Sequence, residues 1–298
     1  MDIVSFSLSS LPKKENLSIS LGTFDGFHEG HAFLARTARY ESSYLNAILL
    51  FSISPTCVLS KLDAPYLTSL EQKIRQAKIN RYEAAYIIEA NEEFFSLTHE
   101  QFEKLLFDIG VKEIFVGEDY RYGKDAIGNT DTLIEAGFKV HVIPLLIKEG
   151  IKISSSNIRR YLLDGDIEKA NSNLGYPYEI EGKVIEGNKI GRTIGFPTLN
   201  LLPSFNNIVP KEGVYAGLVY VRGRPYKAMI SVGHNPTVKG KSLSIEGHLL
   251  DFDEEIYGRQ VSFAFLKRVR DIIEFKDLNG LKAQLEKDKE TLLDLLNE

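Results

Sequence analysis

The chain has 298 residues, 43% hydrophobic and 26% charged, which is the composition of a folded globular protein and a length that favours two domains. Its net charge of −5 leaves no overall basic surface for nucleic acid or an anionic membrane. The single cysteine, Cys57, excludes an intrachain disulfide, and the amino-terminus lacks the basic start and long apolar run of a signal peptide. We therefore expect a cytoplasmic protein with small-molecule ligands.

The first half of the chain alternates strand-like and helix-like segments. The expected strands span residues 17–21, 46–52, 85–88, 112–116 and 139–143, and the expected helices span 32–44, 70–81 and 98–107. Such alternation predicts a parallel sheet covered by helices on both faces. Ligands on these sheets bind outside the carboxyl ends of the strands, so the segments that follow the strands are the places to look for a site.

The pattern changes after about residue 174, where short turns rich in Gly, Pro and Asn separate strand-like segments. The expected strands span residues 178–185, 213–221, 225–232, 243–250 and 261–269, and an amphipathic helix spans 277–296. Consecutive antiparallel strands of this length predict a small barrel. We place the domains at residues 1–174 and 175–298.

The first chemical motif is GTFDGFHEGH, residues 22–31, between the first expected strand and a helix. Its glycines let the backbone turn sharply and approach a ligand. His28 and His31 are three residues apart, so they share a face at the helix start, where free N–H groups attract phosphate. A turn with two solvated histidines is the alternative. The candidate nucleotide-binding residues of this motif are Gly22, Phe24, Asp25, Gly26 and Gly30, together with the two histidines.

Two later segments fit the same site. In ISSSNIRR, residues 153–160, the serines Ser154, Ser155 and Ser156 are expected to precede a helix that runs to about Leu163 and can cap it. Arg159, one turn in, would face phosphate, and a plain cap without function is the alternative. In VGEDYRYGK, residues 116–124, Gly117 and Asp119 follow a strand at the expected ligand edge, although a polar loop would look the same.

A second site is expected in the barrel half, within residues 187–200, GNKIGRTIGFPTLN. Thr198 and Asn200 point to the same face of an extended segment, where a hydroxyl and an amide oxygen can help hold Mg²⁺. On the strand 243–250, Leu243, Ile245 and Leu249 are expected on one face, and Ser244, Glu246 and His248 on the other. Glu246 can accept a proton from an alcohol that attacks the γ-phosphate of ATP, or it can be a solvated strand residue. The glycine-rich stretch that would close over the phosphates supplies Gly191, Gly195 and Pro197.

Together these segments resemble the bifunctional bacterial riboflavin kinase/FAD synthetase family over nearly the whole chain. Further motifs in family order are LGYPYEIEGKV (174–184), SVGHNPTV (231–238), IEGHLLDF (245–252) and IYG (256–258). The resemblance implies a Rossmann-like HxGH nucleotidyltransferase domain that adenylylates FMN, and a barrel that phosphorylates riboflavin. The substrates would be riboflavin, FMN and ATP with Mg²⁺, and the products FAD, ADP and pyrophosphate.

The resemblance also assigns roles to residues. His28 and His31 would lie at the ATP phosphates, with Ser155, Ser156 and Arg159 closing the other side. In the barrel, Thr198 and Asn200 would bind Mg²⁺ and phosphates, and Glu246 would be the base for the ribityl 5′-hydroxyl. Asn235 and Arg270 would lie near the flavin.

The chain departs from the family after the second strand, where a Phe-Asp-Pro-His-Pro type run is replaced by Phe51-Ser52-Ile53-Ser54-Pro55-Thr56. This departure leaves open a riboflavin kinase whose adenylylation domain is inactive. A regulator that binds flavin or nucleotide without turnover is a second alternative, although binding alone needs no base such as Glu246. An HxGH domain acting on another phosphate ester is a third, but it leaves the barrel unexplained.

Overall fold

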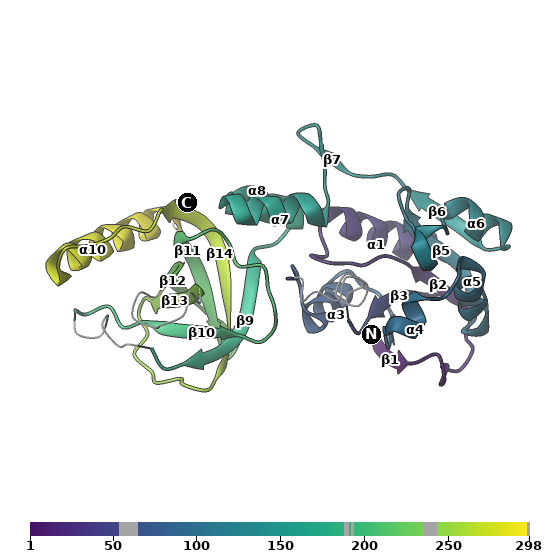
Figure 1. The fold of residues 1–298 in the computed structure, drawn as a ribbon, viewed down its shortest axis with the longest axis horizontal. Helices are drawn as coiled ribbons and strands as arrows, with labels where there is room; N and C mark the ends of the chain where they lie inside the picture. Colours follow the sequence, from purple (N-terminus) through teal and green to yellow (C-terminus); the bar gives the residue numbers. More distant parts are fainter. Residues whose placement is uncertain (54–64, 188–190, 192–193, 235–242, 297–298) are drawn as a thin grey trace. The chain divides into compact units, whose positions relative to one another are not determined.

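The computed structural model describes residues 1–53, 65–187, 191, 194–234 and 243–296, which form two compact units, Met1–Ser155 and Ser156–Glu298 (Figure 1). The division lies at helix α7 (Ser155–Asp164), upstream of residue 174. Helix α8 (Ile167–Leu174) packs on the barrel, where the Asn171 amide donates to the Phe265 carbonyl oxygen at 2.8 Å.

A six-stranded parallel sheet forms the first unit, with strand order β1-β4-β3-β2-β5-β6. The strands are β1 (Asp2–Phe6), β2 (Leu17–Ser20), β3 (Leu45–Phe51), β4 (Ala84–Ile88), β5 (Val111–Gly117) and β6 (Lys139–Ile143). The chain runs outward from β2 through β3 to β4 and then returns to β5 beside β2. This reversal makes the carboxyl ends of β2 and β5 the switch point of the sheet, the position where doubly wound sheets bind ligands.

Helices cover both faces of this sheet. Successive residues of β3 point to opposite faces, and both faces are buried, which explains why the strand is almost entirely apolar. Leu49 joins the core under α5 (His99–Asp108) and α6 (Thr130–Glu135), whereas its neighbours Ile48 and Leu50 join the core under α1 (Glu29–Glu41) and α3 (Leu70–Ile79). A strand buried on both sides has no solvated face to mark with polar residues. The short helix α4 (Glu92–Phe95), the turn η1 (Lys124–Ala126) and the hairpin of β7 (Ile147–Lys148) and β8 (Ile151–Lys152) complete the unit.

The second unit is a closed antiparallel barrel with strand order β10-β13-β12-β11-β14-β9 (Figure 1). Its strands are β9 (Tyr178–Ile185), β10 (Leu199–Pro203), β11 (Gly213–Val221), β12 (Arg224–His234), β13 (Leu243–Leu249) and β14 (Gln260–Arg270). The terminal helix α10 (Leu278–Leu295) packs against β12 and β14, burying Leu292 with Ala216 and Met229.

The expected fold is confirmed, a parallel α/β domain followed by a small antiparallel barrel with a terminal helix. Four strands were missing from the expectation, namely β1, β10 and the two-residue strands β7 and β8. β1 is an edge strand whose first three residues are all exposed or half-exposed. β10 is only five residues long and ends at a proline. Short strands with such weak alternation leave little periodic signal. Within the part of the chain that the structure describes, no helix combines the length and the apolar character needed to cross a bilayer.

Candidate functional site

The turn that joins β2 to α1 is strained and buried. Phe24 and Phe27 adopt the left-handed region, with φ of 49° and 33°, which costs a non-glycine residue about 1–3 kcal/mol. Both side chains are almost fully buried, and their rings stack with centroids 5.8 Å apart. This burial offsets the strain and fixes the backbone immediately before the histidines.

His28 and His31 form a stacked pair at the start of α1, with ring centroids 3.7 Å apart and an interplanar angle of 15°. His28 is the N-cap of α1, and its Nδ1 accepts the His31 N–H at 3.4 Å. Because Nδ1 is an acceptor, the neutral ring carries its proton on Nε2, which is then a hydrogen-bond donor. The pair therefore places an imidazole N–H beside the free N–H groups of a helix start, where anions bind.

Both rings are neutral at pH 7. Burial and the charge of Lys152 lower the pKa of His28 to about 4. Burial, His28 and Lys73 lower the pKa of His31 well below its usual value. The His31 Nδ1 atom is itself buried and has no hydrogen-bond partner among the described residues. Neutral imidazoles can donate hydrogen bonds to phosphate and to charge that develops there during transfer.

Gly30 makes room for the His28 ring. A Cβ atom at residue 30 would lie 3.1 Å from both Cε1 and Nδ1 of His28, closer than ordinary van der Waals contact. Alanine at this helical position should therefore tilt the ring although it favours the helix by up to about 1 kcal/mol.

We expect Gly30→Ala to lower the chemical rate at this site about tenfold while thermal unfolding stays unchanged or moves slightly upward, since a small misplacement of a reacting group is costly. Steady-state kinetics and a melting curve on the same preparation test this. An unchanged rate would mean that the orientation of the His28 ring is unimportant.

Asp25 ties the turn to two other segments. Its carboxylate accepts the Leu67 and Thr68 N–H groups at 3.1 and 3.2 Å, and the Gly26 N–H donates to Thr68 Oγ1 at 2.8 Å. Its carbonyl oxygen accepts the Ser155 hydroxyl at 2.8 Å. The Asp25 carboxylate thus shapes the turn, and Ser155 is brought directly onto the HxGH segment. Helix α7 begins at Ser155, so Ser155 and Ser156 lie in its first turn and not before the helix as expected. Arg159, four residues after Ser155, lies on the same face of that helix.

Asp119 and Lys152 form an ion pair close to His28. Asp119 follows β5, the neighbour of β2, and the Lys152 ammonium on β8 forms an ion pair with its carboxylate. A Cβ at Gly117 would lie 3.3 Å from Asp119 Oδ1, so glycine leaves space for the carboxylate. Both charges act on the pKa of His28, in opposite directions. Lys152 was not among the predicted site residues, although it directly precedes the ISSSNIR motif.

Lys73 is a second residue absent from the prediction. It lies on α3 at 5% exposure and donates to the Thr23 carbonyl oxygen at 3.0 Å. No local motif marks it.

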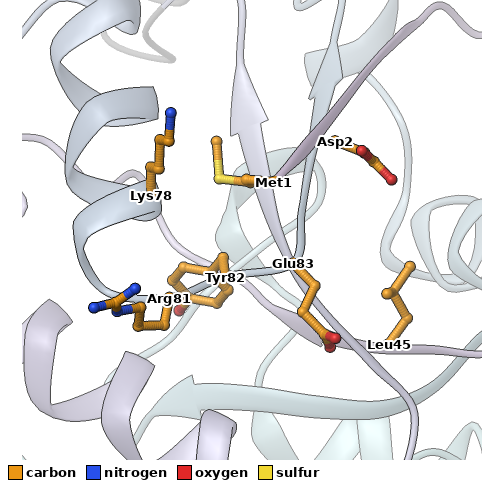
Figure 2. A pocket seen from close by; sticks show the side chains of 7 residues that line it. All are labelled: Met1, Asp2, Leu45, Lys78, Arg81, Tyr82 and Glu83. Atoms are coloured by element: carbon orange, nitrogen blue, oxygen red, sulfur yellow. The ribbon is translucent and has the colours of Figure 1, made fainter.

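A hollow shown in Figure 2 lies elsewhere on this domain. It is lined at the starts of β1, β3 and β4 by residues that include Asp2, Leu45 and Glu83, and so belongs to the amino edge of the sheet, opposite the histidine pair.

In the barrel, three oxygen-bearing side chains converge on neighbouring strands. Asn200 on β10 is paired in register with Glu246 on β13, and the Thr198 hydroxyl donates to Glu246 Oε2 at 3.3 Å. Ile245 and Leu249 are buried while Glu246 and His248 are half-buried, so the expected alternation of faces is confirmed. Burial raises the pKa of Glu246, and the Thr198 hydroxyl partly offsets this.

Two described glycines before β10 approach neighbouring atoms closely. A Cβ at Gly187 would lie 2.1 Å from Asn200 Nδ2, and one at Gly191 would lie 2.1 Å from the Phe196 carbonyl oxygen. Gly195 takes a φ of 86°. The Pro197 carbonyl oxygen accepts the Nδ1–H of His248 at 2.8 Å, which fastens the end of the segment to β13 beside Glu246.

Arg270 is engaged with the terminal helix. Its Nε and Nη2 donate to the two oxygens of the buried Asp288 on α10 at 2.9 and 2.6 Å, and Asp288 also accepts from Gln284. The arginine therefore fastens α10 to the barrel, and its position near a flavin stays a prediction.

Asn235 and residues 54–56 of the family departure lie outside the described residues. Ser52, at the start of that departure, accepts the Ala90 N–H at 3.0 Å.

The donors in the barrel suit Mg²⁺ held mainly by nucleotide phosphates. A hydroxyl, an amide oxygen and a nearby carboxylate are hard oxygen donors, and Mg²⁺ commonly takes only one or two protein ligands with substrate phosphates and water. Among the described residues no group of three or more His, Cys, Asp and Glu side chains is arranged to hold a metal ion. The oxygen donors fit a metal that arrives with its nucleotide better than a resident metal cage.

Comparisons with known proteins match both halves. A riboflavin kinase family model matches residues 174–296, and an FAD synthetase model matches residues 10–157. The bifunctional riboflavin kinase/FMN adenylyltransferase of Listeria monocytogenes is 37% identical over 285 residues, covering 92% of this chain and 91% of its own length. That of Bacillus subtilis is 37% identical over 284 residues, covering 91% and 90%.

A crystal structure described as a macrolide-efflux protein from Streptococcus pneumoniae superposes with a TM-score of 0.88 at 31% identity, covering 97% of this chain and 98% of that one. The likeness in fold therefore extends over both domains. With identity above 30% to relatives that it matches over nine-tenths of their length, the chain belongs to the bifunctional riboflavin kinase/FMN adenylyltransferase family.

Proposed function

We propose that this chain makes both flavin coenzymes, phosphorylating riboflavin to FMN in residues 175–298 and adenylylating FMN to FAD in residues 1–174. The observation that carries the proposal is the presence of two separate phosphate-handling clusters in one chain. One is the neutral His28–His31 pair at a helix start, and the other is Glu246 beside Thr198 and Asn200. Membership of the family supports pairing these two activities.

In FAD formation, a phosphate oxygen of FMN attacks the α-phosphorus of ATP. The new P–O bond forms as the bond to the β-phosphate breaks, and pyrophosphate leaves. No base is needed because the attacking phosphate is already an anion. The His28 Nε2–H and the His31 ring donate hydrogen bonds to the phosphate oxygens as charge builds there, a type of stabilisation worth about 10²–10³ in rate for each donor. Ser155, Ser156 and Arg159 would bind the phosphates from α7, with Gly117 and Asp119 beside the nucleotide or flavin.

In FMN formation, the ribityl 5′-hydroxyl of riboflavin attacks the γ-phosphorus of ATP and ADP leaves. Glu246 accepts the hydroxyl proton as the new P–O bond forms. Thr198 and Asn200 would hold Mg²⁺, which neutralises phosphate charge when bound. Gly191, Gly195 and Pro197 would close over the nucleotide, while Asn235 and Arg270 would lie near the flavin.

A product assay tests the proposal. The purified chain is incubated with riboflavin, ATP and Mg²⁺, and flavins and nucleotides are resolved by chromatography over time. We expect FMN with ADP first, then FAD with pyrophosphate. FMN without FAD, also when FMN is supplied, would leave a kinase with an inactive first domain. Absence of both products would leave a binding protein without turnover.

The acid limb of FMN formation should report Glu246. The carboxylate must be deprotonated to accept a proton, and burial raises its pKa above 4.5. As the pH is lowered, the rate of FMN formation should therefore begin to fall at a higher pH than it would with a base of ordinary glutamate pKa. The turnover number measured against pH at saturating riboflavin and ATP tests this, with circular dichroism at each pH to exclude unfolding. An acid limb below pH 4.5 would contradict Glu246 as the base.

A further inference from the structure

Lys73 is a buried cation in the first domain. Its residue is only 5% exposed, on the second turn of α3, where an uncharged side chain would pack at lower cost. Its ammonium donates to the carbonyl oxygen of Thr23 at 3.0 Å, so it reaches the turn that carries His28 and His31 from a segment fifty residues away. A buried charge at this cost needs a reason in the chemistry of its surroundings.

The surroundings of Lys73 are the strained turn itself. Thr23 directly precedes Phe24, which has a φ of 49°, and the Phe24 ring lies against His31 with centroids 5.0 Å apart. The residues just before α3 hold the next part of the turn, because the Leu67 and Thr68 N–H groups bind the Asp25 carboxylate. Residues 67–73 therefore hold the turn at two points. At one, backbone N–H groups bind the Asp25 carboxylate, and at the other, the Lys73 ammonium binds the Thr23 carbonyl oxygen.

We propose that Lys73 is a positioning residue for adenylyl transfer, whose ammonium fixes the Thr23–Phe24 backbone and keeps a positive charge behind His31. The inference rests on the proposed FAD-forming activity of this site. The charge has a specific consequence, because it opposes a second positive charge on His31. Burial, the neighbouring His28 and this charge together lower the pKa of His31, so it stays an uncharged imidazole when anionic phosphates arrive and its hydrogen-bonding atoms keep one arrangement.

Several charged groups act on the histidine pair, and Lys73 is distinguished among them by its place. His28 lies on the same helix start, and both His28 and Lys73 lower the pKa of His31 in addition to burial. Lys152 on β8 and Asp119 after β5 act on His28 in opposite directions and form an ion pair with each other. The Lys152 and Asp119 side chains are partly exposed, at 38% and 57%, whereas Lys73 is buried. Lys73 is therefore the lysine among these groups whose charge acts on His31 itself.

Three substitutions separate charge from hydrogen bonding. Lys73→Gln removes the charge and keeps a donor for the Thr23 carbonyl oxygen, Lys73→Arg keeps both, and Lys78→Gln removes an exposed lysine from the same helix. For each, the rate of FAD formation from supplied FMN is measured against pH, FMN formation in the barrel is measured as an internal reference, and a melting curve checks folding.

We expect Lys73→Gln to lower the turnover number for FAD formation about tenfold at neutral pH and to move its acid limb toward neutral pH, because the pKa of His31 rises toward its usual value. Lys73→Arg and Lys78→Gln should keep the acid limb of the parent protein, and FMN formation should be unchanged in all three. A parent protein that makes no FAD would refute the proposed activity itself. A parent that makes FAD, with a folded Lys73→Gln variant that keeps both its rate and its acid limb, would refute the role of Lys73.

Discussion

Replacing His31 with alanine should lower FAD formation from FMN and ATP by about 10²–10³-fold, the usual effect of removing one preorganised donor to developing charge. His31 stacks on His28 and packs against Phe24, so its loss removes a donor and also frees the His28 ring to tilt. Formation of FMN from riboflavin should stay at the parent rate, since the barrel has its own cluster. Initial rates of both products, separated by chromatography, give the two numbers from one protein preparation.

His141 offers a matched control for this experiment. It is another partly buried histidine of the same domain, stacked on Phe115 with centroids 4.2 Å apart and paired with Glu41. His141→Ala should leave FAD formation nearly unchanged at a temperature where both variants are folded. If His31→Ala keeps more than about a tenth of the parent rate, or if both histidine variants lose activity equally, the His28–His31 pair has no special part in the transfer.

Replacing Glu246 with glutamine should have the opposite pattern. FMN formation should fall by about 10²–10⁴-fold, the range for loss of a general base, while FAD formation from supplied FMN is unchanged. Glutamine keeps the size of the side chain and an oxygen that can accept the Thr198 hydroxyl, so the local geometry should survive. The measurement is the turnover number for ADP release with riboflavin at saturation.

Glu179→Gln serves as the control for Glu246. Glu179 is a carboxylate on strand β9 of the same barrel that accepts the Ser262 hydroxyl at 2.8 Å, so it tests whether any strand carboxylate matters. We expect it to retain FMN formation. A Glu246→Gln variant that phosphorylates riboflavin at the parent rate would remove the base from the account, and loss of FAD formation in that variant would mean that the two sites are not independent.

Much of the architecture follows from periodicity in the sequence. The unbroken apolar run of β3 predicted a strand buried on both faces, and the alternation along β13 placed Glu246 and His248 together on the less buried face, as the structure confirms. The convergence of Thr198 with Glu246 could be anticipated only through the family motifs, because 48 residues separate them and strand pairing sets the contact. The register of a barrel depends on several strands together, so neither the segment with Thr198 nor the segment with Glu246 predicts the pairing by itself.

The clamp around the HxGH turn could not be predicted in this way. The glycines of the motif predicted a sharp turn, yet the left-handed positions also include Phe24 and Phe27, whose buried rings offset the strain. Asp25 looked like a ligand residue, but its carboxylate binds backbone N–H groups 42 and 43 residues away. Lys73 lies in an ordinary helical segment, and only the packing of α3 against the turn shows what it contacts.

A mixing experiment measures the separateness of the two sites most directly. Neither His31→Ala nor Glu246→Gln alone should convert riboflavin to FAD at an appreciable rate, because each chain lacks one step. Equal amounts of the two variants in one tube, with riboflavin, ATP and Mg²⁺, should form FAD after a lag in which free FMN accumulates. A mixture that makes FMN but no FAD, while Glu246→Gln alone also fails to adenylylate added FMN, would contradict two clusters that each complete one reaction on their own.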